Sequence, residues 1–232
     1  MFHPVDHPLE RGWVGRIEGD RVAQLAAQTL QSFFTGGGSA REHAEFPLAE
    51  VRLLAPVLHP PSIRVFDEQG GCAFANPAAI VGPGATVAPA RAPSATLPQG
   101  ELTLLPRLAA VIGAAGEPAA FTILAEWRDP ARRPPKDRDF ALGLGPVAVT
   151  ADVLDPDGRT IAIHVDGIER ASGAFTGFEW PAAVALAAEG TRLYAGDLIA
   201  GPGVAVGEVI APGSRVELEV DGIGVLEQRL AS

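Results

Sequence analysis

The sequence predicts a mainly β fold of the α+β class, in which a sheet is rolled or sandwiched on itself. Short apolar stretches are broken by 27 Gly and 21 Pro, which favour turns and short elements. Residues 215–220 alternate strictly between apolar and polar side chains, and Asp221-Gly222 then supplies a hairpin turn. A helix is expected at 178–188, with Pro181 in its first turn and Gly190 just past its end. The expected strands are residues 63–66, 79–81, 102–112, 121–127, 147–153, 160–165, 193–199, 215–220 and 224–230.

A small N-terminal α/β domain is expected over residues 1–55, and a larger C-terminal domain over residues 56–232. Residues 14–25 predict a hairpin around the Gly19-Asp20 turn. Apolar residues at helical spacing predict a short helix over 25–34, which the three glycines that follow it would end. The stretch 85–100 is rich in Pro, Ala and Ser and is expected to be a loop.

The composition is that of a globular protein and argues against several classes of partner. Hydrophobic residues make up 47% of the 232 residues and charged residues 20%. The formal net charge of −10 opposes binding to nucleic acid or to an anionic membrane. The single cysteine, Cys72, excludes an internal disulfide and a cysteine-based zinc site. No apolar run approaches the ~18–20 residues that span a bilayer, and the N-terminus lacks the features of a signal peptide, so we expect a cytoplasmic protein.

One basic residue is unusual. Lys136 is the only lysine among the 18 basic residues, and all the others are arginine. The heavy use of Ala, Arg, Gly and Pro indicates codon bias toward arginine. A lysine that persists against this bias can have a role that arginine does not fill, because the two groups differ chemically. Chance is the alternative, and composition alone favours it.

Several segments resemble, in their order and spacing, the motifs of the fumarylacetoacetate hydrolase family over nearly the whole chain. Residues 136–150 (KDRDFALGLGPVAVT) are similar without a gap to the family's K-G-F-D-T-F-x-P-L-G-P-W-L-V-T. Residues 193–200 (LYAGDLIA) are similar to its L-x-P-G-D-V-I-A-T-G-T-P. The other similar segments are residues 51–56, 74–84, 108–113, 165–170 and 213–226. The resemblance implies a rolled β-sandwich with a small N-terminal appendage, and a homodimer formed through the β-rich domain.

The resemblance also implies a chemistry. Members of this family bind one Mg²⁺ or Mn²⁺ through three carboxylates, and they cleave, decarboxylate or isomerise small 2-oxo acids and β-diketones. A hard divalent cation prefers oxygen ligands and can polarise a chelating 2-oxo acid, which stabilises the developing enolate. A lysine and a His–Glu pair then move the protons.

The metal ligands that the resemblance implies are largely lost here. The family's two strand carboxylates, its E-x-E motif, fall on Leu105 and Arg107. Leucine has no donor atom, and arginine carries a permanent positive charge. Glu101 lies too far along the strand to replace them. The third ligand position falls on Glu126, which alone still carries a carboxylate. We therefore expect no bound metal, and Mg²⁺ or Mn²⁺ only if a rebuilt site exists.

The family's acid–base pair is also missing. Its His–Glu motif should follow residues 63–65, where Asp67 and Glu68 instead predict a short polar turn. His59 precedes that strand and is expected at the surface. The lysine of the family's F-x-K-P segment is replaced by Asn76, and its G-T-P segment is reduced to one that begins at Gly201 and lacks the hydroxyl.

Lys136 and Asp139 match the family's K-x-x-D, so the candidate catalytic residues are Lys136, Glu126 and Asp139. Lys136 could pair with Glu126 or with Asp139, or it could simply cap a loop. The candidate ligand-binding residues, at the family's pocket positions, are Arg107, Asn76 and Gly201.

Three hypotheses remain open. The first is an atypical or inactive family member that lacks the metal and either binds a small carboxylate or 2-oxo acid or acts as a subunit. The second is an active hydrolase, decarboxylase or isomerase of acylpyruvate-like 2-oxo acids, with Arg107 stabilising the enolate, Lys136 as acid–base and Glu126 orienting it. The third is a scaffold or regulator, which a pocket filled by Leu105, Trp127 and arginine side chains would favour and an intact pocket lined by Lys136, Arg107 and Glu126 would oppose.

Overall fold

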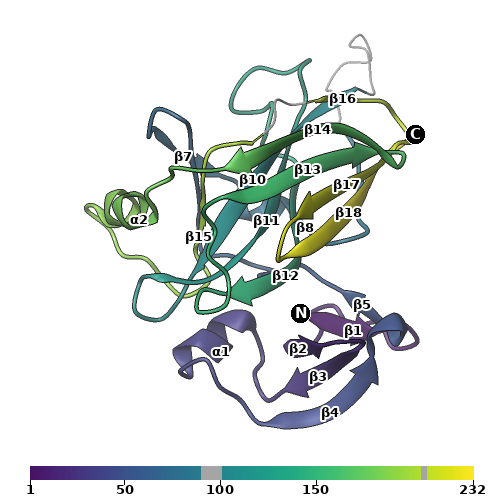
Figure 1. Cartoon of the computed structure of the whole chain (residues 1–232), viewed down its shortest axis with the longest axis vertical. Coiled ribbons are helices and arrows are strands. Elements are labelled where there is room, and N and C mark those ends of the chain that lie inside the picture. Colours follow the sequence, from purple (N-terminus) through teal and green to yellow (C-terminus); the bar gives the residue numbers. More distant parts are fainter. Residues whose placement is uncertain (90–100, 205–207) are drawn as a thin grey trace.

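Two β-sheets stacked face to face form the body of the molecule, with the smaller sheet in front in Figure 1. The computed structural model describes residues 1–89, 101–204 and 208–232. In order, the larger sheet contains β7 (Cys72–Ala75), β6 (Ile63–Phe66), β15 (Leu198–Ala200), β10 (Leu102–Ile112), β11 (Pro118–Arg128), β12 (Leu142–Thr150) and β8 (Ile80–Val81), with β16 (Glu208–Ile210) paired to β10 off this path. The smaller sheet contains β14 (Ile168–Phe175), β13 (Arg159–Val165), β17 (Arg215–Val220), β18 (Gly224–Leu230) and β9 (Thr86–Val87). The predicted mainly β class and rolled sandwich are therefore confirmed.

The main core lies between the two sheets. Strands β17 and β18 alternate, so that Val216, Leu218 and Leu226 point inward while the residues between them face solvent. Strands β10 and β11 are instead covered on both faces, and they are apolar almost throughout. On the inner face of β10, Leu104 and Leu108 join the main core.

The other face of β10 changes character along the strand, and this positions the candidate site. Ala109 and Val111 belong to a second core on that face, which also includes Val57 and Phe34 of the N-terminal part. The preceding residues on the same face are Leu105 and Arg107, which lie beyond this second core. The polar side chain of Arg107 therefore lies next to the apolar end of this strand face.

The N-terminal residues form two small sheets of their own, below the body in Figure 1. Strands β2 (Gly15–Glu18), β3 (Arg21–Leu25) and β4 (Glu42–Pro47) make one, and β1 (Phe2–Pro4) and β5 (Val51–Leu53) make the other. The hairpin expected at 14–25 is present as β2 and β3.

The helix expected at 25–34 is wrong in its first half. Helix α1 covers only Leu30–Thr35, because Leu25 is the last residue of β3 and pairs with β4. The helix begins after Thr29, whose hydroxyl accepts from the Ser32 amide at 3.1 Å in a capping box. The apolar residues just before it belong to strand β3 instead.

Most of the expected elements of the body are present, with some changes of length. Helix α2 (Trp180–Ala188) has Pro181 in its first turn, as predicted. The strand expected at 193–199 is mostly wrong, since β15 begins only at Leu198. Gly196 has a φ of 88°, and the Asp197 carboxylate accepts from the Tyr194 amide at 2.7 Å, so this stretch is a turn. Strand β12 covers Leu142–Thr150 rather than the predicted 147–153, so both of its predicted ends are wrong.

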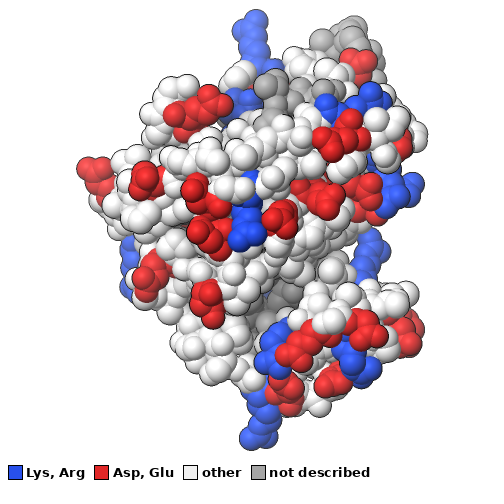
Figure 2. All heavy atoms as spheres, in the orientation of Figure 1, with Lys and Arg blue, Asp and Glu red and all other residues white. Residues whose placement is uncertain are grey.

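The predicted loop at 85–100 contains the short strand β9 at its start, and residues 90–100 lie outside the described part of the chain. Among the residues that the structure describes, no helix is long and apolar enough to cross a membrane. On the face shown in Figure 2, basic side chains are interspersed with acidic ones and do not gather into a patch.

A buried polar contact ties the two sheets together. Trp127 of β11 donates from Nε1 to Oε1 of Gln228 of β18 at 2.7 Å, and both residues are buried. Gly143 lies against this amide so closely that a Cβ there would overlap it. The glycine therefore makes room for the bridge between the sheets.

Candidate functional site

The candidate site is built on two neighbouring antiparallel strands. In the register of β10 and β11, Leu105 lies directly opposite Glu126, and Arg107 lies opposite Leu124. Directly opposed residues share a face of the sheet, and so do residues two apart on one strand. Leu105, Arg107 and Glu126 therefore project from the same face of the sheet.

Arg107 and Glu126 form a buried ion pair. Nε of Arg107 donates to Oε2 of Glu126 at 2.7 Å, and the residues are only 4% and 1% exposed. Nη1 of Arg107 also donates to the backbone carbonyls of Phe66 at 2.8 Å and Gly201 at 2.7 Å. The guanidinium thus joins β6, β11 and the segment after β15.

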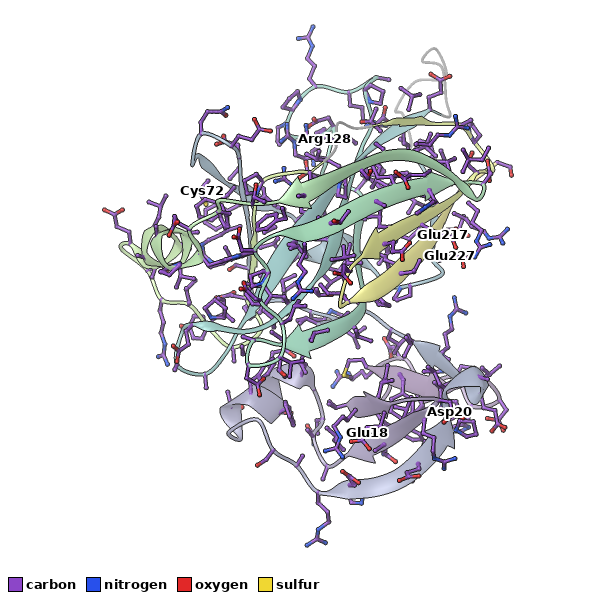
Figure 3. All side chains as sticks on the ribbon, in the orientation of Figure 1. Glu18, Asp20, Cys72, Arg128, Glu217 and Glu227 are labelled. Atoms are coloured by element: carbon purple, nitrogen blue, oxygen red, sulfur yellow. The ribbon has the colours of Figure 1, made fainter. Side chains whose placement is uncertain are left out.

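Two further arginines contact the same carboxylate. Arg128, labelled in Figure 3, binds Oε1 of Glu126 through Nε at 2.7 Å and Nη2 at 2.6 Å. Arg138 approaches Oε1 at 3.9 Å and also pairs with Asp137 at 3.2 Å. Both oxygens of Glu126 are therefore engaged by guanidinium groups. Burial lowers the pKa of Arg107, and the charge and hydrogen bond of Glu126 partly offset this effect.

Leu105 is the other residue that the resemblance assigns to the family's E-x-E motif. Its side chain packs so closely on Gly203 that a Cβ on that glycine would overlap it. Leucine therefore fills space here and offers no donor atom. The small residue at 203 is needed to admit it.

The residues present do not fit a divalent cation. Mg²⁺ and Mn²⁺ are held by oxygen donors, with carboxylates as the charged ones. Here a hydrocarbon and a cation stand beside the one carboxylate, whose oxygens already accept from arginines. Across residues 1–89, 101–204 and 208–232, no three His, Cys, Asp or Glu side chains are close enough together to hold a metal ion.

The structure places Lys136 away from Glu126. Its Nζ pairs with Oδ2 of Asp139 at 2.6 Å, and its side chain is 71% exposed. Of the two partners that the sequence offered, Lys136 therefore has Asp139, at the surface rather than in a pocket. Asn76 donates to the backbone carbonyl of Asp139 at 3.0 Å and accepts from the Ala78 amide at 3.0 Å. Asn76 thus holds the loop that carries this pair.

Other polar residues take the structural roles expected of them. The Oδ1 atom of Asp67 accepts from the amides of Gln69 at 3.0 Å and Gly71 at 2.6 Å, so this is the predicted polar turn. His59 is exposed, as predicted for a surface histidine. The backbone of Gly201 serves the site through its carbonyl, while its Cα lies so near Phe175 that a Cβ would come within 2.7 Å of the ring.

A cavity of about 700 Å³ lies beside the ion pair. The turn at 66–70, the end of β14, one side of α2 and residues 202–204 line it. It shares two residues with the site, since Phe66 gives its carbonyl to Arg107 and Gly203 contacts Leu105. A cavity of this size is in the range of small-molecule sites.

Comparison with known proteins identifies the family. A sequence model described as the C-terminal domain of fumarylacetoacetate (FAA) hydrolase matches residues 67–231. A second, described as Rv2993c-like, N-terminal, matches residues 12–56. The chain therefore belongs to the fumarylacetoacetate hydrolase family. No curated protein sequence matches the chain.

Solved structures share this fold over nearly their whole length. The maleylpyruvate hydrolase of Sphingobium sp. SYK-6, in complex with manganese(II) and pyruvate, has a TM-score of 0.78 and 22% identity, with 96% of this chain and 97% of that chain covered. The fumarylacetoacetate hydrolase of Exiguobacterium antarcticum has a TM-score of 0.80 and 22% identity, with 96% of each chain covered. The 5-carboxymethyl-2-hydroxymuconate delta-isomerase of Mycobacterium smegmatis has a TM-score of 0.75 and 22% identity, with 99% and 97% covered.

Sequence reasoning missed the two arginines that complete the cluster. Arg128 lies two residues after Glu126 on the same strand, and alternation places both on one face, so this contact had a signal. Arg138 lies in the stretch between β11 and β12, and nothing in the sequence pattern directs that stretch back to Glu126. The aromatic wall of the cavity also had no signal, because Phe66 and Phe178 are far apart in the chain.

Proposed function

We propose that this chain is a family member in which a buried Arg–Glu ion pair stands where relatives hold a divalent metal. On this proposal it performs no metal-dependent chemistry on 2-oxo acids, and it binds a small molecule in the adjacent cavity. The observation that carries the proposal is the 2.7 Å contact of Arg107 with Glu126 in a buried position. A guanidinium in a ligand position supplies the positive charge from the protein itself, and repels a second cation.

The electrostatic argument supports the same conclusion. Glu126 is surrounded by Arg107, Arg128 and Arg138, whose charges together exceed that of the carboxylate. A divalent ion would have to displace at least one guanidinium and then remain close to the others. The attraction of a single carboxylate does not offset that repulsion.

Thermal unfolding gives a direct test of the proposal. A protein that binds metal in its native state is stabilised by the metal and destabilised by a chelator. We expect the Tm of the purified chain to be the same in excess EDTA and in millimolar Mn²⁺ or Mg²⁺. A rise of several degrees with micromolar Mn²⁺, reversed by EDTA, would show that the proposal is wrong.

Turnover of 2-oxo acids by a rebuilt, metal-free site is the second candidate. The cavity lies directly beside a buried guanidinium, and relatives with this fold include a maleylpyruvate hydrolase. Its acid–base group would be Lys136, which points to solvent with Asp139. Acylpyruvate and oxaloacetate assays with and without EDTA test this candidate, and an unchanged rate in Lys136→Ala would remove Lys136 from it.

Binding of a small carboxylate, a homodimeric assembly and a cytoplasmic location stay predictions. A carboxylate ligand of Arg107 would have to compete with Glu126 and two backbone carbonyls for its nitrogens. Sedimentation of the purified chain measures the assembly, and a homodimer is the expected result.

A further inference from the structure

The cavity beside the ion pair has an aromatic wall. The rings of Phe66 and Phe178 meet edge to face with centroids 5.7 Å apart, and those of Phe175 and Phe178 do so at 5.9 Å. All three residues are at the cavity, but Phe66 and Phe175 are each only 2% exposed, so the partly exposed Phe178 provides the accessible ring. Leu186 of α2 and Val204 add further apolar surface. This wall suits the apolar or aromatic part of a small molecule.

The charged residues around the cavity all have the same sign. Asp67, Glu68 and Glu179 line it, and no lysine, arginine or histidine is among its lining residues. None of the three carboxylates forms an ion pair with a residue in the described part of the chain. The lining therefore carries three carboxylates, none of them in an ion pair among the described residues, although Oδ1 of Asp67 already accepts from two amides of its own turn.

The positive charge of the ion-pair site does not neutralise the three carboxylates that line the cavity. Arg107 is 4% exposed, and its Nη1 donates to the carbonyls of Phe66 and Gly201, so it is held among backbone atoms and outside the lining. Its Nε pairs with Glu126 at 2.7 Å, and Arg128 and Arg138 likewise lie outside the lining. A dianionic ligand in the cavity would thus meet three carboxylates without a metal to offset them.

We propose that this cavity binds an organic cation, namely an amine or quaternary ammonium that carries an apolar or aromatic body. The partly exposed ring of Phe178 would contact the body or the cationic group, while the carboxylates supply charge complementarity. This inference rests on the proposed function, because a bound divalent metal would change the charge of the neighbourhood. It reverses the ligand charge that the family resemblance implies.

Three probes of similar shape test the proposal. Phenethylammonium is the cation, 2-phenylethanol is the neutral isostere, and 3-phenylpropanoate is the anion. We expect calorimetry at low salt to show the cation binding at least tenfold more tightly than the anion. Amide chemical shifts of Gly177 and Gly203, which line the cavity, should move with the cation. Raising the salt concentration should weaken the cation's binding, because exposed charges are screened.

Variants that each remove one charge test which carboxylates attract the cation. Glu68→Gln and Glu179→Gln should each weaken phenethylammonium binding about threefold to tenfold while leaving 2-phenylethanol unaffected. Phe178→Leu should weaken the cation by about threefold through loss of the ring face. The matched control is Glu189→Gln, at the other end of α2 and outside the cavity lining, which should leave binding within about twofold.

The proposal is overturned if 3-phenylpropanoate or pyruvate binds as tightly as the cation. It is also overturned if the cation shows no binding at 10 mM, or if the Glu→Gln variants match the control. These outcomes are separate from the failure of the proposed metal-free site, which the metal titration decides. A chain that binds neither metal nor cation would keep the proposed metal-free site and lose this inference.

Discussion

Arg107 and Glu126 are partners across two neighbouring strands, with Nε and Oε2 2.7 Å apart and both side chains almost wholly removed from solvent. A buried pair of this kind contributes little net stability by existing, but breaking it leaves an uncompensated charge in the interior. Substitution of either residue alone is therefore expected to destabilise the fold. The pair gives the site a fixed internal cation, which on the proposed function stands in place of an exchangeable metal ion.

Removing the cation should be costly. Arg107→Met leaves Glu126 with fewer partners and strips the carbonyls of Phe66 and Gly201 of their donor. We expect the free energy of unfolding in urea to fall by about 3–5 kcal/mol. In the double variant Arg107→Met/Glu126→Gln, the loss of unfolding free energy should be smaller than the sum of the losses in the two single variants. If the losses simply add, the two residues are not coupled as described.

Lys136 should contribute almost nothing to stability. Its pair with Asp139 is at the surface, and the lysine side chain is 71% exposed. We expect Lys136→Ala to change the free energy of unfolding by no more than about 0.5 kcal/mol. It should also leave phenethylammonium binding unchanged. A loss of 2 kcal/mol or more would mean that Lys136 has a buried partner in solution.

Gly203 should tolerate a side chain only if Leu105 is shortened. A Cβ at 203 would overlap the leucine, so Gly203→Ala should cost about 1–3 kcal/mol by overpacking. Leu105→Ala removes the obstructing atoms. In the double variant Leu105→Ala/Gly203→Ala, the alanine at 203 should therefore lower the free energy of unfolding much less. An unchanged loss would mean that Leu105 does not pack on Gly203. Urea unfolding of the four proteins completes this cycle.

The contact between the two sheets should also be measurable. Gln228→Leu leaves Nε1 of Trp127 buried without an acceptor, which should cost about 1–3 kcal/mol. In a Trp127→Phe background the same change should cost less, because the donor is gone. Equal costs in the two backgrounds would contradict the hydrogen bond.

The sequence predicted the body of the fold best where one physical signal was strong. Strand β10 matches the predicted 102–112, and its long apolar run is typical of a strand that is covered on both faces. Strands β17 and β18 match because of strict alternation and the Asp221-Gly222 turn. The helix at 25–34 failed because Leu25 satisfies a helical spacing and a strand pairing equally well.

The site was predicted in part. The family resemblance placed Leu105, Arg107 and Glu126 at ligand positions, and the strand register brings them to one face. It could not give the partner of Lys136, because the residues around it form turns whose path depends on contacts such as that of Asn76 with the Asp139 carbonyl. The cavity wall was equally inaccessible, since its rings come from segments more than a hundred residues apart.

A gain of metal binding should follow from restoring the missing carboxylates. Leu105→Glu/Arg107→Glu places three acidic side chains on one face, together with Glu126. Removing the guanidinium also relieves the repulsion of a dication. We expect this variant to bind Mn²⁺ detectably, and circular dichroism is the measurement that checks whether it folds. A folded variant without affinity would mean that the remaining arginines still exclude the metal.

The most direct measurement is a titration of the unaltered, metal-stripped protein with Mn²⁺, read by calorimetry and by the electron paramagnetic resonance of the free ion. If the Arg107–Glu126 pair occupies the metal position, no binding appears up to millimolar Mn²⁺, and the free-ion signal rises in proportion to the metal added. Saturable binding of one Mn²⁺ per chain at micromolar concentration would contradict the account.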